Sequence, residues 1–230
     1  MDDRETIDES YTRYYGKQRH SKVYPTEFVV RTFLANYPGL RCRKPKKSDK
    51  ILDVAFGDGR NTAFLCDLEL DVYGIEITQE IVDQTQQRLS LLGYNPKLRV
   101  GRNSDIPFDD HSFDYLLACH CCYYCDEGQV LLDNLREYAR VLKKGGVLIA
   151  SVADLNSFVF RNSERLSDGA MKITSDPYNN RNGYRLFGFS SSEEIEVYFG
   201  TFFKCFSHGH ADNDYYGINE RVFWTTCEKI

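Results

Sequence analysis

Apolar positions along this chain follow two periods, one typical of buried strands and one typical of amphipathic helices. Short apolar runs predict strands at 50–55, 71–76, 97–101, 113–118 and 146–152. Helical patterns alternate with them, and we expect helices at 25–34, 60–68, 78–92, 128–142 and 190–199. Two last strands, 202–208 and 219–228, are expected to pair antiparallel. The pattern predicts an α/β fold, a doubly wound, mostly parallel seven-stranded sheet with a C-terminal antiparallel strand pair and helices on both faces.

Three segments lack a clear period. Residues 1–10 are expected to be frayed, and the basic run 41–50 to be a solvated connector. The segment 154–188 is long, polar and rich in turn residues, which predicts a loop-rich insertion. Because the chain shows no internal repeat and no linker, we expect residues 1–230 to form a single domain.

Composition narrows the class of protein. Hydrophobic residues make up 42% of the 230 residues and the mean hydropathy is −0.49, as in soluble globular proteins. No apolar run approaches the length of a membrane span, and the first residues are charged, without an apolar signal region. We therefore expect a cytoplasmic protein whose eight cysteines are reduced thiols. The net charge of −5 argues against a large nucleic-acid footprint.

The first strand ends in a glycine-rich turn. Small residues fall at Ala55, Gly57 and Gly59, and the bulky Arg60 follows. Glycines in such a turn let the backbone bend sharply and let a ligand approach closely. The spacing lacks the third glycine of the dinucleotide fingerprint, which counts against a nicotinamide oxidoreductase. The next strand ends in Glu76, whose carboxylate can accept hydrogen bonds from both hydroxyls of a ribose.

Four motifs occur in a characteristic order: LDVAFGDG at 52–59, GIE at 74–76, IPFDDHSFD at 106–114 and LKKGGVL at 142–148. Together they resemble the cofactor loop, the ribose clamp and the two strand entries of class I S-adenosylmethionine-dependent methyltransferases. The resemblance is specific from about residue 48 to 152 and looser to residue 230. It implies an enzyme that binds S-adenosylmethionine and releases S-adenosylhomocysteine.

The resemblance implies roles for matching positions. Asp53 would hold the methionine ammonium, Glu76 the ribose hydroxyls, and Ile77 would lie against the adenine. The family's N-terminal segments often cover the cofactor, so residues 1–40 are expected to form a helical lid. The remaining residues expected at the cofactor are the loop positions Ala55, Gly57 and Gly59, the adenine-side Asn103 and Ser104, the strand tip Cys119 and, from the lid, Tyr14, with Tyr15 and His20 as further lid residues.

Two departures from the family pattern bear on cofactor binding. Ala55 stands where the family loop has its first glycine, so a positive φ there would force the ligand to shift. After Gly101 the family often has an aspartate for the adenine amino group, whereas this chain has Arg102, which cannot accept a hydrogen bond. Asn103 or Ser104 would then take that role.

A general base would help an oxygen or nitrogen acceptor lose its proton. His120 is the first choice, because it follows the fourth strand and its ordinary pKa lies near neutrality. The other candidates expected at the same mouth are Tyr123, Tyr124, Asp154, His208, His210 and Asp212. The cysteines around His120 invite a zinc hypothesis, but zinc sites pair two separated ligand clusters, and buried thiols are the simpler interpretation, so we predict no metal.

These observations favour methylation of a small-molecule or glycan-type acceptor, without a membrane partner. The segment 154–188 would form the acceptor side, and its cations and aromatics suit an anionic or glycosidic substrate. Three alternatives stay open: an RNA methyltransferase, a protein methyltransferase, and a catalytically silent binding protein that keeps the fold. The sequence does not specify the methylated atom or the oligomeric state.

Overall fold

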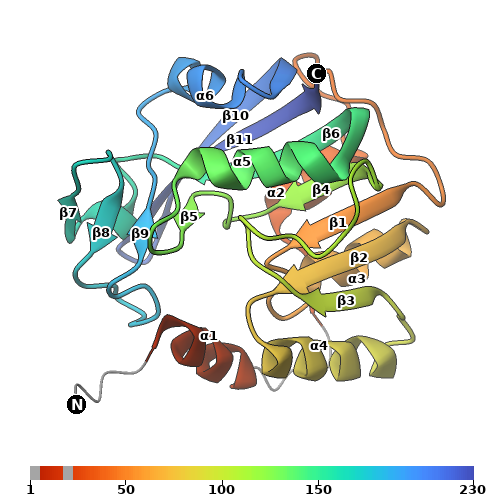
Figure 1. Cartoon of the computed structure of the whole chain (residues 1–230), viewed down its shortest axis with the longest axis horizontal. Coiled ribbons are helices and arrows are strands. Elements are labelled where there is room, and N and C mark those ends of the chain that lie inside the picture. Colours follow the sequence, from red (N-terminus) through yellow and green to blue (C-terminus); the bar gives the residue numbers. More distant parts are fainter. Residues whose placement is uncertain (1–5, 18–22) are drawn as a thin grey trace.

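The computed structural model describes residues 6–17 and 23–230. Its centre is a seven-stranded sheet in the order β10-β11-β6-β4-β1-β2-β3 (Figure 1). The strands that run parallel in it are β1 (Lys50–Val54), β2 (Asp71–Glu76), β3 (Lys97–Val100), β4 (Phe113–Ala118) and β6 (Leu142–Ala153). The hairpin of β10 (Phe203–Tyr215) and β11 (Ile218–Lys229) completes the sheet, with β11 antiparallel to β6. The predicted sheet is confirmed.

Helices cover both faces of the sheet because the central strands are apolar on both sides. Leu52, Leu116 and Leu148 pack in one cluster with α5 (Leu131–Val141) and α6 (Ser192–Phe199). The alternate positions Ile51 and Leu117 pack in a second cluster with α2 (Glu27–Leu34) and α3 (Arg60–Asp67). This alternation is the period of two expected of strands buried on both faces.

The helix α4 (Gln79–Leu91) begins where the sequence predicted. The Thr78 hydroxyl accepts a hydrogen bond from the backbone N–H of Ile81 at 3.3 Å. This side-chain cap satisfies one of the backbone donors that every helix start leaves unpaired. Because α4 packs against β2 and β3, it fixes the edge of the sheet where β2 ends.

The N-terminal helix α1 (Ile7–Gly16) corrects the expectation of a frayed start. Thr6 and Glu9 form a capping box, in which the Glu9 N–H donates to the Thr6 hydroxyl and the Thr6 N–H donates to the Glu9 carboxylate, at 3.2 and 2.7 Å. Figure 1 shows α1 beside α4, below the ends of the central strands. Residues 1–5 and 18–22, including His20, lie outside the described part of the chain.

The segment 154–188 is more regular than predicted. It contains the 3-10 turn η1 (Phe158–Phe160) and the strands β7 (Ser163–Arg165), β8 (Met171–Ile173) and β9 (Arg185–Leu186). With β5 (Tyr124–Cys125) these strands form a four-stranded antiparallel sheet in the order β5-β9-β8-β7. A strand of two or three residues is too short to show a period in the sequence, which is why it was missed.

The C-terminal hairpin extends beyond the sheet that it completes. β10 was expected to end near residue 208, but its pairing with β11 continues to Tyr215, opposite Ile218. Tyr216 and Gly217 between them have φ of +55° and +90°, as the two-residue turns that suit the twist of a hairpin require. The overhanging tip therefore reaches toward the small sheet. In the described residues no helix is both long and apolar enough to cross a membrane.

Candidate active site

The turn after β1 requires glycine at two positions. Gly57 has φ +56°, and a Cβ placed there would lie 2.6 Å from the Cζ and Oη atoms of Tyr15. Gly59 has φ +77°, and its Cβ would lie 2.7 Å from Thr85 on α4. Ala55 has φ +54°, a left-handed conformation that costs an L-residue roughly 1–2 kcal/mol. Ala55, which replaces the first glycine of the family loop, therefore carries its methyl group at a positive φ.

Glu76, at the end of β2, is held by the same turn. One carboxylate oxygen accepts from the Gly57 N–H at 3.0 Å, and the other accepts from the Ile77 N–H at 2.8 Å. The residue is only 4% exposed. Burial raises its pKa to about 7, against the two backbone hydrogen bonds, which lower it. A carboxylate offers about four acceptor sites, so sites remain for a ligand, and the residue fits a pair of ribose hydroxyls.

Asp53 lies deeper. Its Oδ2 atom accepts from the Thr62 hydroxyl at 2.7 Å, and burial, with added repulsion from Glu76, raises the pKa of Asp53 to about 7. A buried carboxyl with a raised pKa is a good partner for a cationic group of a ligand, because a nearby cation stabilises the ionised form of the carboxyl.

A cavity of about 360 Å³ opens beside these carboxyls. Several residues predicted from the sequence line it together: Tyr14, Ala55, Glu76, Ile77, Asn103, Cys119, His120 and Tyr124. Four predicted cofactor residues, Asp53, Gly57, Gly59 and Ser104, are not on its wall. Gly57 and Gly59 are instead covered by the side chains of α1 and α4.

The sequence predicted part of the opposite wall, namely Tyr15 of the lid and the cations and aromatics of the segment 154–188, but not the residues from the C-terminal hairpin. This wall comes from α1, from η1, from the segment after β8 and from the C-terminal hairpin: Tyr11, Tyr15, Phe158, Tyr178, Asn180, Arg181, Tyr184, Tyr215, Ile218 and Glu220. These residues are far apart in the sequence, and only their polar-aromatic character signalled a ligand.

His120 extends from the end of β4 into this cavity. Its φ is +57°, and its backbone N–H donates to the Ser151 hydroxyl at 2.7 Å. Burial lowers the pKa of His120 below its ordinary value, while the Glu220 carboxylate opposes the shift. The imidazole is therefore neutral at pH 7, in the form that can accept a proton.

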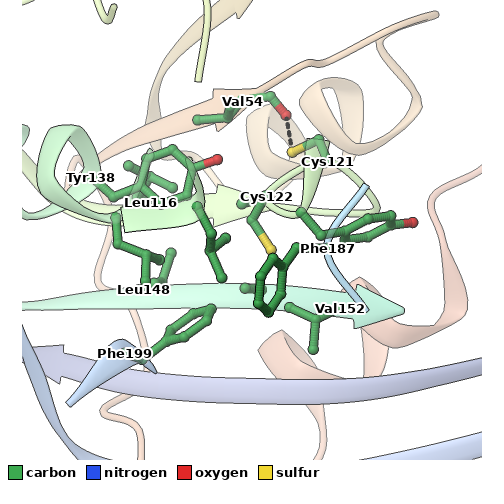
Figure 2. Packing of buried hydrophobic residues seen from close by; sticks show 14 of the residues in the cluster. Val54, Leu116, Cys121, Cys122, Tyr138, Leu148, Val152, Phe187 and Phe199 are labelled. Atoms are coloured by element: carbon green, nitrogen blue, oxygen red, sulfur yellow. Dashed lines mark hydrogen bonds between the residues drawn. The ribbon is translucent and has the colours of Figure 1, made fainter. Parts of the chain in front are cut away.

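The cysteines around His120 belong to the core. The Cys121 thiol donates to the Val54 carbonyl at 3.2 Å, and Cys122 lies among Leu148, Val152 and other apolar side chains (Figure 2). Burial raises the pKa of Cys119 to about 12, so this thiol is protonated at neutral pH. Within residues 6–17 and 23–230 no three His, Cys, Asp or Glu side chains gather as metal ligands would.

Arg102, the second departure, connects α1 to the small sheet. Its guanidinium pairs with Asp8 of α1 at 2.5 Å and with Asp126 at 3.1 Å. The neighbouring Asn103 lines the cavity, but its amide is already engaged. The amide donates to the Cys121 carbonyl at 2.9 Å and accepts from the Tyr138 hydroxyl at 2.7 Å.

The predicted polar residues at the C-terminal side lie away from the cavity. Asp154 accepts from His210 at 3.0 Å, His208 is 3.1 Å from Glu196 of α6, and Asp212 pairs with Arg221. None of the three histidine or aspartate positions on β10, nor Asp154, is on the cavity wall. Asp154 is instead bonded to the long hairpin, and its catalytic role stays a prediction.

This arrangement defines a class of protein, since the strand order, the glycine turn and the acidic end of β2 are those of the class I methyltransferase fold. Residues 52–150 match a family model described as a methyltransferase domain. Over these residues the chain is similar to S-adenosylmethionine-dependent methyltransferases.

Comparison with curated relatives and solved structures shows how much of the chain this similarity covers. The protein-L-isoaspartate O-methyltransferase of Christiangramia forsetii is 48% identical over 52 residues, which are 23% of this chain and 24% of that protein. The Dictyoglomus turgidum enzyme of the same name is 28% identical over 109 residues, 46% of this chain and 45% of its own. The chain thus spans less than half the length of these curated relatives.

A Pyrococcus horikoshii protein has a TM-score of 0.64 at 20% identity, covering 80% of this chain and 83% of its own. A Methanosarcina mazei methyltransferase has a TM-score of 0.64 at 19% identity, covering 81% and 94%. At such identities the likeness concerns the fold.

Proposed function

We propose that this chain binds S-adenosylmethionine and transfers its methyl group in line to a small-molecule acceptor, releasing S-adenosylhomocysteine. The observation that carries the proposal is Glu76, a buried carboxylate held by Gly57 and Ile77 on the wall of the cavity that His120 enters. A 1,6-didemethyltoxoflavin-N1-methyltransferase of Burkholderia thailandensis, solved with S-adenosylhomocysteine, shares the fold at a TM-score of 0.58 and 14% identity.

When bound, the cofactor supplies an electrophilic methyl group on a sulfonium. Glu76 would accept hydrogen bonds from the ribose hydroxyls, Ile77 would lie against the adenine, and the buried Asp53 carboxylate would stabilise the ammonium. Because the acceptor gains a methyl group while the C–S electron pair goes to sulfur, an O–H or N–H acceptor must lose a proton. The neutral His120 imidazole accepts it.

The size and walls of the cavity favour a small acceptor. Its volume of about 360 Å³ is at the lower end of the range of roughly 300–1,000 Å³ that ligand sites occupy. The helix α1 and the hairpin tip both contribute to its walls. The relatives named for protein-L-isoaspartate support a protein acceptor only weakly, since each match covers less than half of that relative.

Titration calorimetry of the purified chain tests the cofactor. S-adenosylhomocysteine should bind in the micromolar range, NAD should not bind, and Glu76→Ala should weaken binding about tenfold or more, since hydrogen bonds to a charged group are each worth roughly 1.5–3 kcal/mol. Glu80→Ala is the matched control, because Glu80 is an exposed residue of α4 whose carboxylate accepts a hydrogen bond from the Gln84 side chain at 3.1 Å. If the folded protein did not bind S-adenosylhomocysteine, the proposal would be refuted. The alternative of a catalytically silent binding protein that keeps the fold would then be favoured.

A second experiment tests the acceptor class. S-adenosylhomocysteine release is followed with a small-molecule panel, with bulk RNA and with an isoaspartyl peptide. Turnover with the panel alone supports the proposal. Turnover with RNA that weakens as salt is added would identify RNA as the acceptor instead of a small molecule. Turnover with the peptide would identify a protein acceptor.

A further inference from the structure

Arg181 stands on the acceptor side of the cavity with its donors only partly used. Its Nε–H donates to the Tyr124 hydroxyl at 2.8 Å, and its Nη1 donates to Asp176 at 2.9 Å. The Asp176 side chain is fully buried, and that of Arg181 is 24% exposed, where it lines the cavity. A guanidinium carries five N–H donors. No described residue accepts from its Nη2, so this edge is open to a ligand.

Tyr124 adds a second donor at the same place. Its hydroxyl oxygen accepts from Arg181 and also from the Tyr11 hydroxyl, at 3.1 Å. With both lone pairs accepting, its own O–H proton must point to a third group, and no described residue accepts it. Two aromatic rings border this position. The Phe158 ring lies 6.0 Å from the Arg181 guanidinium, and the Tyr184 ring lies 5.0 Å from the ring of Tyr124.

We infer that the acceptor carries an oxyanion, a carboxylate or a phosphate, which binds to the open edge of Arg181 and to the Tyr124 hydroxyl. An oxyanion is the group that accepts from a guanidinium edge and a hydroxyl together. The neutral His120 and the acidic Glu220 line the same cavity, so the acceptor's nucleophilic end is turned toward them. This inference rests on the proposed function and makes Arg181 the residue that determines specificity.

The test measures binding to the protein saturated with S-adenosylhomocysteine, by titration calorimetry. The probes are phenylacetate, its neutral isostere phenylacetamide, phenyl phosphate, acetate and inorganic phosphate. We expect phenylacetate or phenyl phosphate to bind about tenfold or more tightly than phenylacetamide, and the better of the two identifies the oxyanion. Equal binding of charged and neutral probes, or no binding of any probe, would overturn the inference.

Variants assign the preference to Arg181. Arg181→Met alone would strand the buried Asp176 carboxylate, so the decisive variant is Arg181→Met with Asp176→Asn, which removes both charges. It should bind the charged and the neutral probe equally. Asp176→Asn alone frees the guanidinium from its competing carboxylate and should tighten anion binding, a gain that a purely structural role would not produce.

Two controls separate the possible failures. Arg161→Met removes an exposed cation of the same segment and should leave the preference unchanged. S-adenosylhomocysteine is titrated first for every variant. If it does not bind the native chain, the proposed function fails. If it binds and no anion preference follows, only the present inference fails.

Discussion

The contact between Tyr15 and Gly57 allows a quantitative test of how α1 covers the cofactor loop. In Gly57→Ala the new Cβ would lie 2.6–2.8 Å from three atoms of the Tyr15 side chain, closer than any Cβ contact tolerates. The φ of +56° adds a separate cost of roughly 1–2 kcal/mol. The clashing atoms belong to the far end of the Tyr15 side chain, on the short helix α1. The clash is therefore relieved when this side chain moves away from Gly57.

The displacement of the Tyr15 side chain determines how much stability Gly57→Ala loses. Displacing a half-buried tyrosine loses about 1–2 kcal/mol of packing, so Gly57→Ala should lower the free energy of unfolding by roughly 2–4 kcal/mol in total. Tyr15→Ala alone should cost about 1–2 kcal/mol. In the double variant the clash is absent, so its stability should equal that of Gly57→Ala, with a coupling energy of about 1–2 kcal/mol.

Urea unfolding followed by circular dichroism measures all four proteins. Gly93→Ala is the matched control, because Gly93 also has a positive φ, +88°, but a Cβ there meets nothing within 4 Å. It should cost only the backbone term of about 1–2 kcal/mol and should add to Tyr15→Ala. Costs of Gly57→Ala and Tyr15→Ala that add within about 0.5 kcal/mol would refute the contact between α1 and the loop.

Three further predictions concern the carboxyls and the histidine. The pKa of Glu76 is raised to about 7, so the folded protein binds more protons than the unfolded chain between pH 4.5 and about 7. This carboxyl therefore lowers stability as pH rises through that window, while S-adenosylhomocysteine, which needs the ionised form, binds more tightly, with proton release visible in calorimetry with two buffers. His120→Asn, whose side chain tolerates φ +57°, should lower kcat about 10²–10⁴-fold and leave S-adenosylhomocysteine affinity unchanged; full turnover would remove His120 as the base. Asp154→Asn should cost about 1–2 kcal/mol of stability through its bond to His210 but leave kcat intact, and a large kcat loss would restore its catalytic role.

The cofactor half of the cavity was predictable because its determinants are local. The strand that ends in the glycine turn, the strand that ends in Glu76 and the Thr78 cap are each specified by a few consecutive residues. Parallel strands bring such ends to one edge of a sheet, so the sequence order suffices to bring Glu76 and His120 to one cavity. The Thr6-x-x-Glu9 capping box was equally readable and was overlooked.

The acceptor half depends on contacts between distant segments. Asp154 was expected at the reacting centre because it follows the strand β6, yet it bonds to His210 of the hairpin and is not on the cavity wall. Arg181 and Glu220 reach one cavity only because very short strands and an overhanging hairpin fold toward each other. No period or spacing encodes such an encounter, since neither segment carries a repeated pattern.

The helix α1 joins the two halves. On the cofactor side its Thr12 hydroxyl lies 3.0 Å from that of Thr78, and Tyr15 covers Gly57. On the acceptor side Tyr11 donates to Tyr124, the hydroxyl that also accepts from Arg181. A helix of ten residues is marginal by itself and is ordered by the surfaces it packs on. We therefore expect a ligand that orders α1 on one side of the cavity to order it on the other. Cofactor and acceptor would then each raise the affinity for the other, by linkage by the same factor.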